Sequence, residues 1–136
     1  MICCDIMLGR GVNVKAQLFI KKHVLYIRFS GELDSSVANG LRIKVTELIE
    51  NYKIKYLVLN CEKLTFMDSS GIGFIIGRYN QLQDIGGAIF MTNLNELLRK
   101  IVKISGVYKL VCVKSNEDEV NELLEVYNGK IHENAI

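Results

Sequence analysis

The stretch LTFMDSSGIGFIIGRYNQLQDIGG, residues 64–87, holds the side chains best suited to chemistry. Asp68 is a residue type favoured at helix N-caps, where its carboxylate accepts hydrogen bonds from backbone N–H groups of the first turn. Ser69 and Ser70 then fall on that turn, at the positive end of the helix. A phosphate on Ser69 would add roughly 1.5 to 2 negative charges beside free N–H groups, so we expect the fold to tolerate it. A partner surface shaped to the neutral hydroxyl would reject it.

Three glycines argue against a purely structural helix cap. Gly71, Gly73 and Gly77 each cost a helix roughly 1 kcal/mol relative to alanine, so something must need the space that they leave. Gly71 lies within one turn of Ser69, and we expect it on a partner-facing surface. Gly73 and Gly77 are four residues apart, and we expect them on the side of the helix that packs on the sheet.

Two catalytic interpretations fit the same stretch less well. Gly71 and Gly73 could begin a dinucleotide-binding fingerprint, but the third glycine falls at position 77 instead of 76. The following strand also ends in Thr92 and Asn93, where an acidic ribose ligand is needed. A serine hydrolase requires a G-x-S-x-G elbow, which the sequence lacks.

Cysteine and histidine spacing predicts no metal site. The chain has four cysteines without a C-x-x-C pair, and its two histidines lie far from every cysteine. We therefore predict no catalytic residue, no metal ligand and no cofactor-binding residue.

Composition indicates one globular domain. The 136 residues are 49% apolar, and 17 Lys and Arg stand against 15 Asp and Glu, a net charge of +2. These values exclude intrinsic disorder and a disulfide scaffold, and the bulk charge does not suggest a nucleic-acid partner. No apolar run reaches the roughly 18 to 20 residues of a membrane-spanning helix, and the first residues do not read as a signal peptide. We expect a cytoplasmic protein without membrane insertion.

Apolar periodicity predicts the elements that position the serines. Residues 14–30 are typical of an antiparallel hairpin, and residues 56–60 of a buried parallel strand. Between them lies a helix that Asp34, Ser35 or Ser36 can cap. A polar connection over residues 61–68, anchored by apolar side chains, leads to the helix at Ser69. The anchors are Leu64, Phe66 and Met67, and the predicted apolar stripe of the helix is Ile72, Ile75, Ile76, Tyr79 and Leu82.

The rest of the chain repeats this alternation. We predict a strand at residues 88–91, a helix at about 95–104, a strand at 110–113 and a helix at about 116–127. Alternating strands and helices indicate an α/β layer fold.

The run MDSSGIGFIIGRYNQLQDIGG, together with SGELD at residues 30–34 and the strand YLVLN, resembles the STAS domain of bacterial anti-sigma-factor antagonists, most closely the sporulation members that control sigma F. The resemblance covers about residues 14–127. It implies a mixed β-sheet of about four to five strands packed against about four helices. It assigns residues 1–13 to an N-terminal extension, a disordered tail or the product of a misplaced start codon. The resemblance implies that residues 14–128 form the STAS domain and residues 129–136 a C-terminal tail.

The resemblance also implies a function in transcription regulation. In the family, the unphosphorylated antagonist binds an anti-sigma factor that is also a serine kinase, a GHKL-type ATPase, and so releases the sigma factor. The kinase phosphorylates the serine after the Asp of DSSG, which matches Ser69, and a PP2C-type phosphatase reverses the step. The implied protein is a partner-switching phosphoprotein, not an enzyme, with Asp34, Asp68, Ser69, Ser70 and Gly71 at the partner.

Two other functions stay open at this point. The chain could be a STAS module of another signalling pathway, or a weak nucleotide-binding domain. A pull-down with unphosphorylated protein separates them, because only the antagonist hypothesis predicts a GHKL-type ATPase as the main partner.

Overall fold

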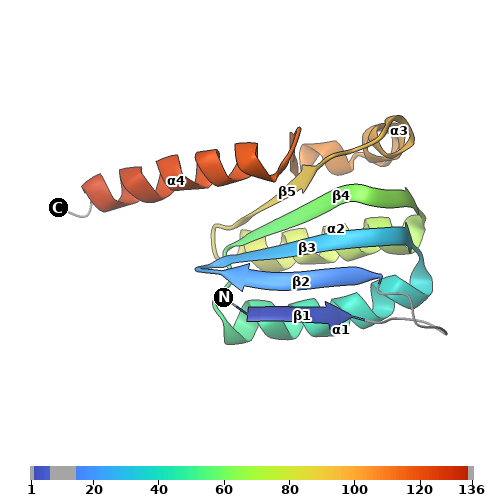
Figure 1. Ribbon diagram of the computed structural model, residues 1–136, viewed down its shortest axis with the longest axis horizontal. Coiled ribbons are helices and arrows are strands. Elements are labelled where there is room, and N and C mark those ends of the chain that lie inside the picture. Colours follow the sequence, from blue (N-terminus) through green and yellow to red (C-terminus); the bar gives the residue numbers. More distant parts are fainter. Residues whose placement is uncertain (1, 7–14, 135–136) are drawn as a thin grey trace.

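Within residues 2–6 and 15–134, whose backbone the computed structural model describes, six strands form one mixed sheet with helices on both faces (Figure 1). Side chains are described for residues 15–126. The strands are β1 (Ile2–Ile6), β2 (Ala16–Lys21), β3 (Val24–Leu33), β4 (Tyr56–Met67), β5 (Ala88–Thr92) and β6 (Cys112–Lys114). The helices are α1 (Ser35–Asn51), α2 (Ser69–Gln83), α3 (Glu96–Ser105), the short 3₁₀ helix η1 (Val107–Lys109) and α4 (Glu117–Asn134).

The strands follow one another across the sheet in chain order. Pairing is antiparallel from β1 to β3 and parallel from β3 to β6. The predicted α/β fold with a mixed sheet and four helices is confirmed, and β2 and β3 form the predicted hairpin. The sheet exceeds the predicted four to five strands because β1, from the segment assigned to the N-terminal extension, pairs with β2. The rest of that extension lies outside the described residues.

Strand β4 is longer than the sequence indicated. The polar connection predicted at residues 61–68 continues the strand to Met67, with every third residue buried instead of every second. Two register shifts between β3 and β4, at Arg28/Ser30 and Gly31/Glu32, explain that pattern. Such bulges break the alternation by which a strand is recognised in a sequence.

The C-terminal elements are shifted relative to their predicted positions. The strand expected at residues 110–113 is β6, and η1 precedes it. Helix α4 runs to Asn134 and so includes most of the predicted tail, whose residues 135–136 lie outside the described part.

Two apolar layers hold the fold together. On one face of the sheet, residues such as Leu25 and Ile27 pack against α1, α2 and α3. On the other face, α4 places Val120 and Leu124 against a smaller cluster that includes Val58. Burial of apolar area in both layers is the main favourable term in folding.

The ends of β3 and β4 position the serine-bearing helix. These neighbouring strands are parallel, and their last residues, Leu33 and Met67, are partners in the register. Helices α1 and α2 begin two residues beyond these ends, after Asp34 and Asp68 respectively. Both helix N-termini therefore lie at one edge of the sheet.

Candidate functional site

Asp34 caps α1, as one of the three predicted alternatives. Its carboxylate accepts hydrogen bonds from the Ser36 hydroxyl at 2.7 Å and the Val37 amide at 3.1 Å. These two interactions, the Ser36 hydroxyl first, lower the pKa of Asp34. Asp34 is thus a carboxylate at neutral pH, held at the sheet edge where α2 also begins.

Asp68 caps α2 as predicted. One oxygen of its carboxylate accepts from the Ser70 amide at 2.8 Å and from the Gly71 amide at 3.3 Å. The sequence suggested free N–H groups for a phosphate on Ser69, but these two amides already have an acceptor. Added negative charge on Ser69 would lie beside the Asp68 carboxylate, where like charges repel.

The hydroxyl-bearing turn is accessible. Ser69 is exposed and Ser70 is half-buried. Phe66, which we expected to anchor the preceding connection, is 39% exposed at the end of β4. An aromatic side chain so close to Ser69 in the chain offers a partner apolar contact area that sequence reasoning missed.

Gly71 is buried, and so does not lie on the partner-facing surface where we expected it from the sequence. A Cβ added there would lie 3.0 Å from the Leu33 carbonyl oxygen and 3.0 Å from the Met67 Cβ. The glycine lets the first turn of α2 approach the ends of β3 and β4. Its role in the site is to position Ser69.

Gly73 and Gly77 lie on the opposite side from the one predicted. Gly73 is exposed and Gly77 half-buried. Apart from its chain neighbours and the backbone of its own helix, a Cβ on either would meet no described atom within 4 Å. They therefore face open space along α2. Because Gly73 and Gly77 follow Ser69 by four and eight residues, they lie on the same flank of the helix as Ser69.

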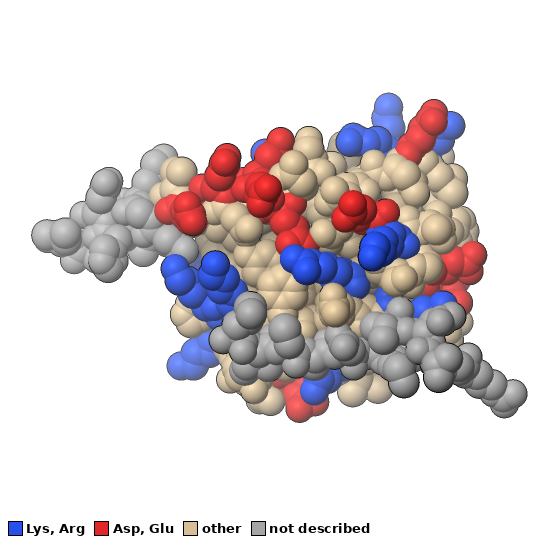
Figure 2. Space-filling model, in the orientation of Figure 1, with Lys and Arg blue, Asp and Glu red and all other residues tan. Residues whose placement is uncertain are grey.

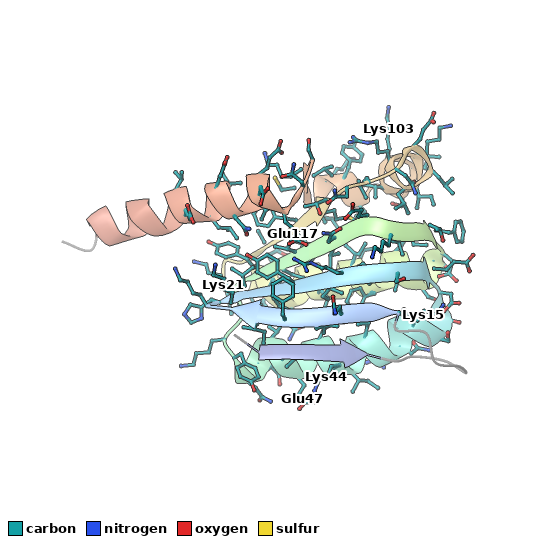
Figure 3. The ribbon with its side chains drawn as sticks, in the orientation of Figure 1. Lys15, Lys21, Lys44, Glu47, Lys103 and Glu117 are labelled. Carbon is teal, nitrogen blue, oxygen red and sulfur yellow. The ribbon has the colours of Figure 1, made fainter. Side chains whose placement is uncertain are left out.

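A second polar cluster occupies the opposite face of the sheet. Arg28 donates two hydrogen bonds to Glu117, from Nε at 3.0 Å and Nη2 at 2.9 Å, and Asn60 donates a third. Figure 3 shows Glu117 at the start of α4, over the sheet. These groups line an open hollow of about 540 Å³. Sequence patterns carry no signal for this cluster, because Arg28, Asn60 and Glu117 come from three distant segments.

Charge in this hollow does not favour a phosphate ligand. Its lining includes Glu62, Glu117 and Asp118 against Arg28 and Lys63, and Arg28 is engaged by Glu117. Acidic side chains also gather along α4 on this side of the molecule (Figure 2). A nucleotide would bring its phosphates close to these carboxylates.

Metal and membrane sites are not evident in the part of the chain that is described. Within it, no three His, Cys, Asp or Glu side chains come together in a group that could hold a metal ion. No helix there combines the length and apolar character needed to cross a membrane.

The sequence pattern of the STAS domain matches residues 15–120, so the chain belongs to the STAS domain family, as its sequence indicated. It is 33% identical over 115 residues to the anti-sigma F factor antagonist of Paenibacillus polymyxa, which covers 85% of this chain and 97% of that protein.

Two solved structures are similar over most of the chain. One is the anti-sigma factor antagonist SpoIIAA in its unphosphorylated form, with a TM-score of 0.68 and 27% identity over 81% of this chain and 97% of that chain. The other is the Bacillus cell fate determinant SpoIIAA in the phosphorylated form, with a TM-score of 0.66 and 28% identity over 79% and 98%. The STAS fold is thus shared with a protein known in two phosphorylation states.

Proposed function

We propose that this protein is an anti-sigma-factor antagonist. Its unphosphorylated form binds a kinase-type anti-sigma factor, a GHKL-type ATPase, and so releases a sigma factor, with sigma F of sporulation as the target. The observation that carries the proposal is Ser69, an exposed serine on the first turn of α2 behind an Asp68 cap. Its similarity to an anti-sigma F factor antagonist and to SpoIIAA supports the choice of pathway.

The contact surface combines the two caps with the exposed turn. Asp34, Asp68, Ser69 and Ser70 lie at one edge of the sheet, and Phe66 adds apolar area beside them. Charged and polar groups that flank an apolar patch are the usual make-up of a transient protein interface. Gly71 contributes indirectly, by fixing the turn on which Ser69 stands.

Phosphorylation of Ser69 acts as the switch in this proposal. The fold does not use the Ser69 hydroxyl in any hydrogen bond among the described residues, so the modification leaves the core intact. The phosphate brings roughly two negative charges beside the Asp68 carboxylate. An unpaired charge buried in an interface costs several kcal/mol, which is enough to release the partner. A PP2C-type phosphatase restores the binding form.

The protein is a substrate in this cycle, not an enzyme. The kinase and the phosphatase supply the chemistry, and the chain supplies an accessible hydroxyl on a rigid helix start. Placing a modifiable group on a regular element, with a capped and tightly packed first turn, gives both enzymes the same geometry to recognise.

Ser69→Ala and Ser69→Asp test the proposal, with Ser70→Ala as the matched control. All three should unfold within about 1 kcal/mol of the wild type, because position 69 is exposed and Ser70 is at the surface edge. By calorimetry with the anti-sigma kinase encoded in the same genome, Ser69→Ala should bind as tightly as wild type and Ser69→Asp at least tenfold more weakly.

Incubation with that kinase and ATP should place one phosphate on Ser69, found by peptide mass mapping, in the wild type and in Ser70→Ala. Phosphate mainly on Ser70, or equal affinity of the Ala and Asp variants, would contradict the switch. A lysate pull-down whose main partner is not a GHKL-type ATPase would place the chain in another pathway.

A further inference from the structure

Arg78 on α2 is buried with its charge unmatched. The residue is 8% exposed, and its Nε and Nη1 atoms are buried without a hydrogen-bond partner in the described part of the chain. The guanidinium carbon lies 5.4 Å from the centre of the Phe74 ring, a cation–π contact that satisfies no N–H group. Buried guanidinium groups are normally paired, so the N–H groups of this one stay available to an acceptor.

A second arginine faces the same place from α1. Helices α1 and α2 lie side by side behind the sheet (Figure 1), and the Gln81 side chain donates to the Thr46 carbonyl across their junction. Burial first, and then repulsion by Arg42, lower the pKa of Arg78. Arg42 is exposed, and neither arginine forms an ion pair with a carboxylate of the described residues. Arg42 lies four residues before Thr46 on α1 and Arg78 three residues before Gln81 on α2, about one helical turn from this hydrogen bond in each case. Two cations thus lie at one junction without a carboxylate partner among the described residues.

The outer surface of α1 and α2 suits a polypeptide better than a free ion. Gly73 and Gly77 leave open space along α2, so a partner backbone can approach closely. Two isoleucines on the outer sides of these helices are exposed, Ile43 by 62% and Ile76 by 38%, although Ile76 was predicted on the buried stripe. A partner that covers these two helices would therefore meet both arginine and exposed apolar area, two features of protein interfaces.

We propose that the junction of α1 and α2 at Arg42 and Arg78, here called the arginine seam, receives an aspartate or glutamate side chain of the protein that binds at Ser69. Arg42 makes the first contact from the exposed side, and a small rotation brings the Arg78 guanidinium onto the same carboxylate. Guanidinium and carboxylate groups match as paired hydrogen bonds. The identity of the partner rests on the proposed function; the anion-binding seam does not.

Three variants test the seam against that partner. Arg42→Gln removes the exposed charge, Arg78→Met replaces the buried one with an apolar side chain of similar length, and Lys44→Gln is the control. The Lys44→Gln substitution also removes one charge from α1, but Figure 3 shows Lys44 at the edge of the molecule away from α2. Calorimetry with the same anti-sigma kinase should show at least tenfold weaker binding for both arginine variants and less than a twofold change for Lys44→Gln.

Melting temperature separates a binding role from a structural one. Arg78→Met should melt at or above the wild type, because it removes a buried charge that lacks a partner. Wild-type affinity of both arginine variants, with binding lost in Ser69→Asp, would overturn the seam and leave the proposed function standing. A melting temperature of Arg78→Met below that of the wild type would show that this arginine stabilises the fold. In that case the affinity of Arg42→Gln, which changes an exposed residue and should fold normally, decides whether the seam binds the partner.

A partner-free measurement covers the case in which the anti-sigma kinase does not bind at all. Sulfate is the probe, compared with chloride at equal ionic strength. An anion that binds only the folded state stabilises it. The melting temperature in sulfate minus that in chloride should therefore be at least about 2 °C larger for the wild type and Lys44→Gln than for Arg42→Gln. Equal rises in all three proteins would overturn the anion site, whatever the partner.

Discussion

Gly71→Ala asks whether the first turn of α2 needs glycine for packing. The new Cβ would lie 3.0 Å from the Leu33 carbonyl oxygen and 3.0 Å from the Met67 Cβ, both closer than ordinary van der Waals contact. One neighbour is backbone at the end of β3, and the other is the first side-chain carbon at the end of β4. Neither can turn away as the tip of a long side chain could. The start of α2 must therefore move.

The size of the effect follows from two opposing terms. Forcing one methyl group into a closed space costs about 1 to 3 kcal/mol. Alanine is the better helix former by about 1 kcal/mol, which offsets part of that cost. The expected net loss is about 1 kcal/mol, or a melting temperature lower by roughly 3 to 5 °C in a chain of this length.

Gly73→Ala is the matched control, two residues further along the same helix. A Cβ there meets no described atom within 4 Å, so only the propensity term remains. This variant should gain up to about 1 kcal/mol, and the two proteins should differ by roughly 2 kcal/mol in opposite directions from the wild type. Thermal and urea unfolding of the isolated domain measure both.

The same pair reports on the site. A displaced first turn would weaken the 3.3 Å hydrogen bond from the Gly71 amide to Asp68, so Gly71→Ala should also slow phosphorylation of Ser69. Equal stability of the two variants, or a less stable Gly73→Ala, would refute the placement of these glycines.

Two further outcomes concern groups away from Ser69. Burial raises the pKa of Glu117, but hydrogen bonds from Arg28 and Asn60 outweigh it and leave the pKa below its usual value. A carboxylate with a lowered folded pKa stabilises the fold above its unfolded pKa, and this stabilisation is lost as the pH falls through the folded pKa. The urea concentration at the unfolding midpoint should therefore decrease as the pH falls below about 4, and less steeply in Glu117→Gln. Parallel pH profiles of the two proteins would contradict this. Burial raises the pKa of the Cys61 thiol to about 12, so iodoacetamide at pH 8 should label it only after unfolding, and peptide mapping that finds fast native labelling would disprove its burial.

Features of the fold that depend on interactions between residues close in the chain could be predicted from the sequence. The hairpin, the alternation of strands and helices and the caps at Asp34 and Asp68 follow from periodicity and from the hydrogen bonds that short polar side chains make. Asp34 and Asp68 lie at one edge of the sheet because β3 and β4 pair in parallel. Local patterns do not predict that pairing, since it joins residues far apart in the chain.

The second half of β4 could not be predicted from alternation. Bulges opposite residues 28–32 change which side chains point inward, and the buried positions Cys61, Leu64 and Met67 then recur every third residue. That spacing looks like a loop with scattered anchors.

The glycines were placed on the wrong sides because the buried stripe of α2 was set one position out. The buried residues include Gly71, Ile75, Arg78 and Leu82, at helical spacings of four, three and four. A glycine and an arginine lie in that stripe; from the sequence we expected Gly71 on a partner-facing surface, and the predicted apolar stripe does not include Arg78. The periodicity was present in the sequence, but only the burial of Arg78 reveals its phase.

Helix α2 therefore separates folding from recognition across its own width. Gly71 and Ile75 fix its inner side to the ends of the strands, whereas Ser69 and Gly73 on the outer side make no packing contribution. A phosphate on the outer side can then change partner binding while the fold persists. Arg78 is the exception, since a charged side chain lies within the buried stripe and its burial lowers stability unless an anion is bound. Selection for stability alone would replace it with an apolar residue, so its presence is best explained by a contact that the isolated chain does not make.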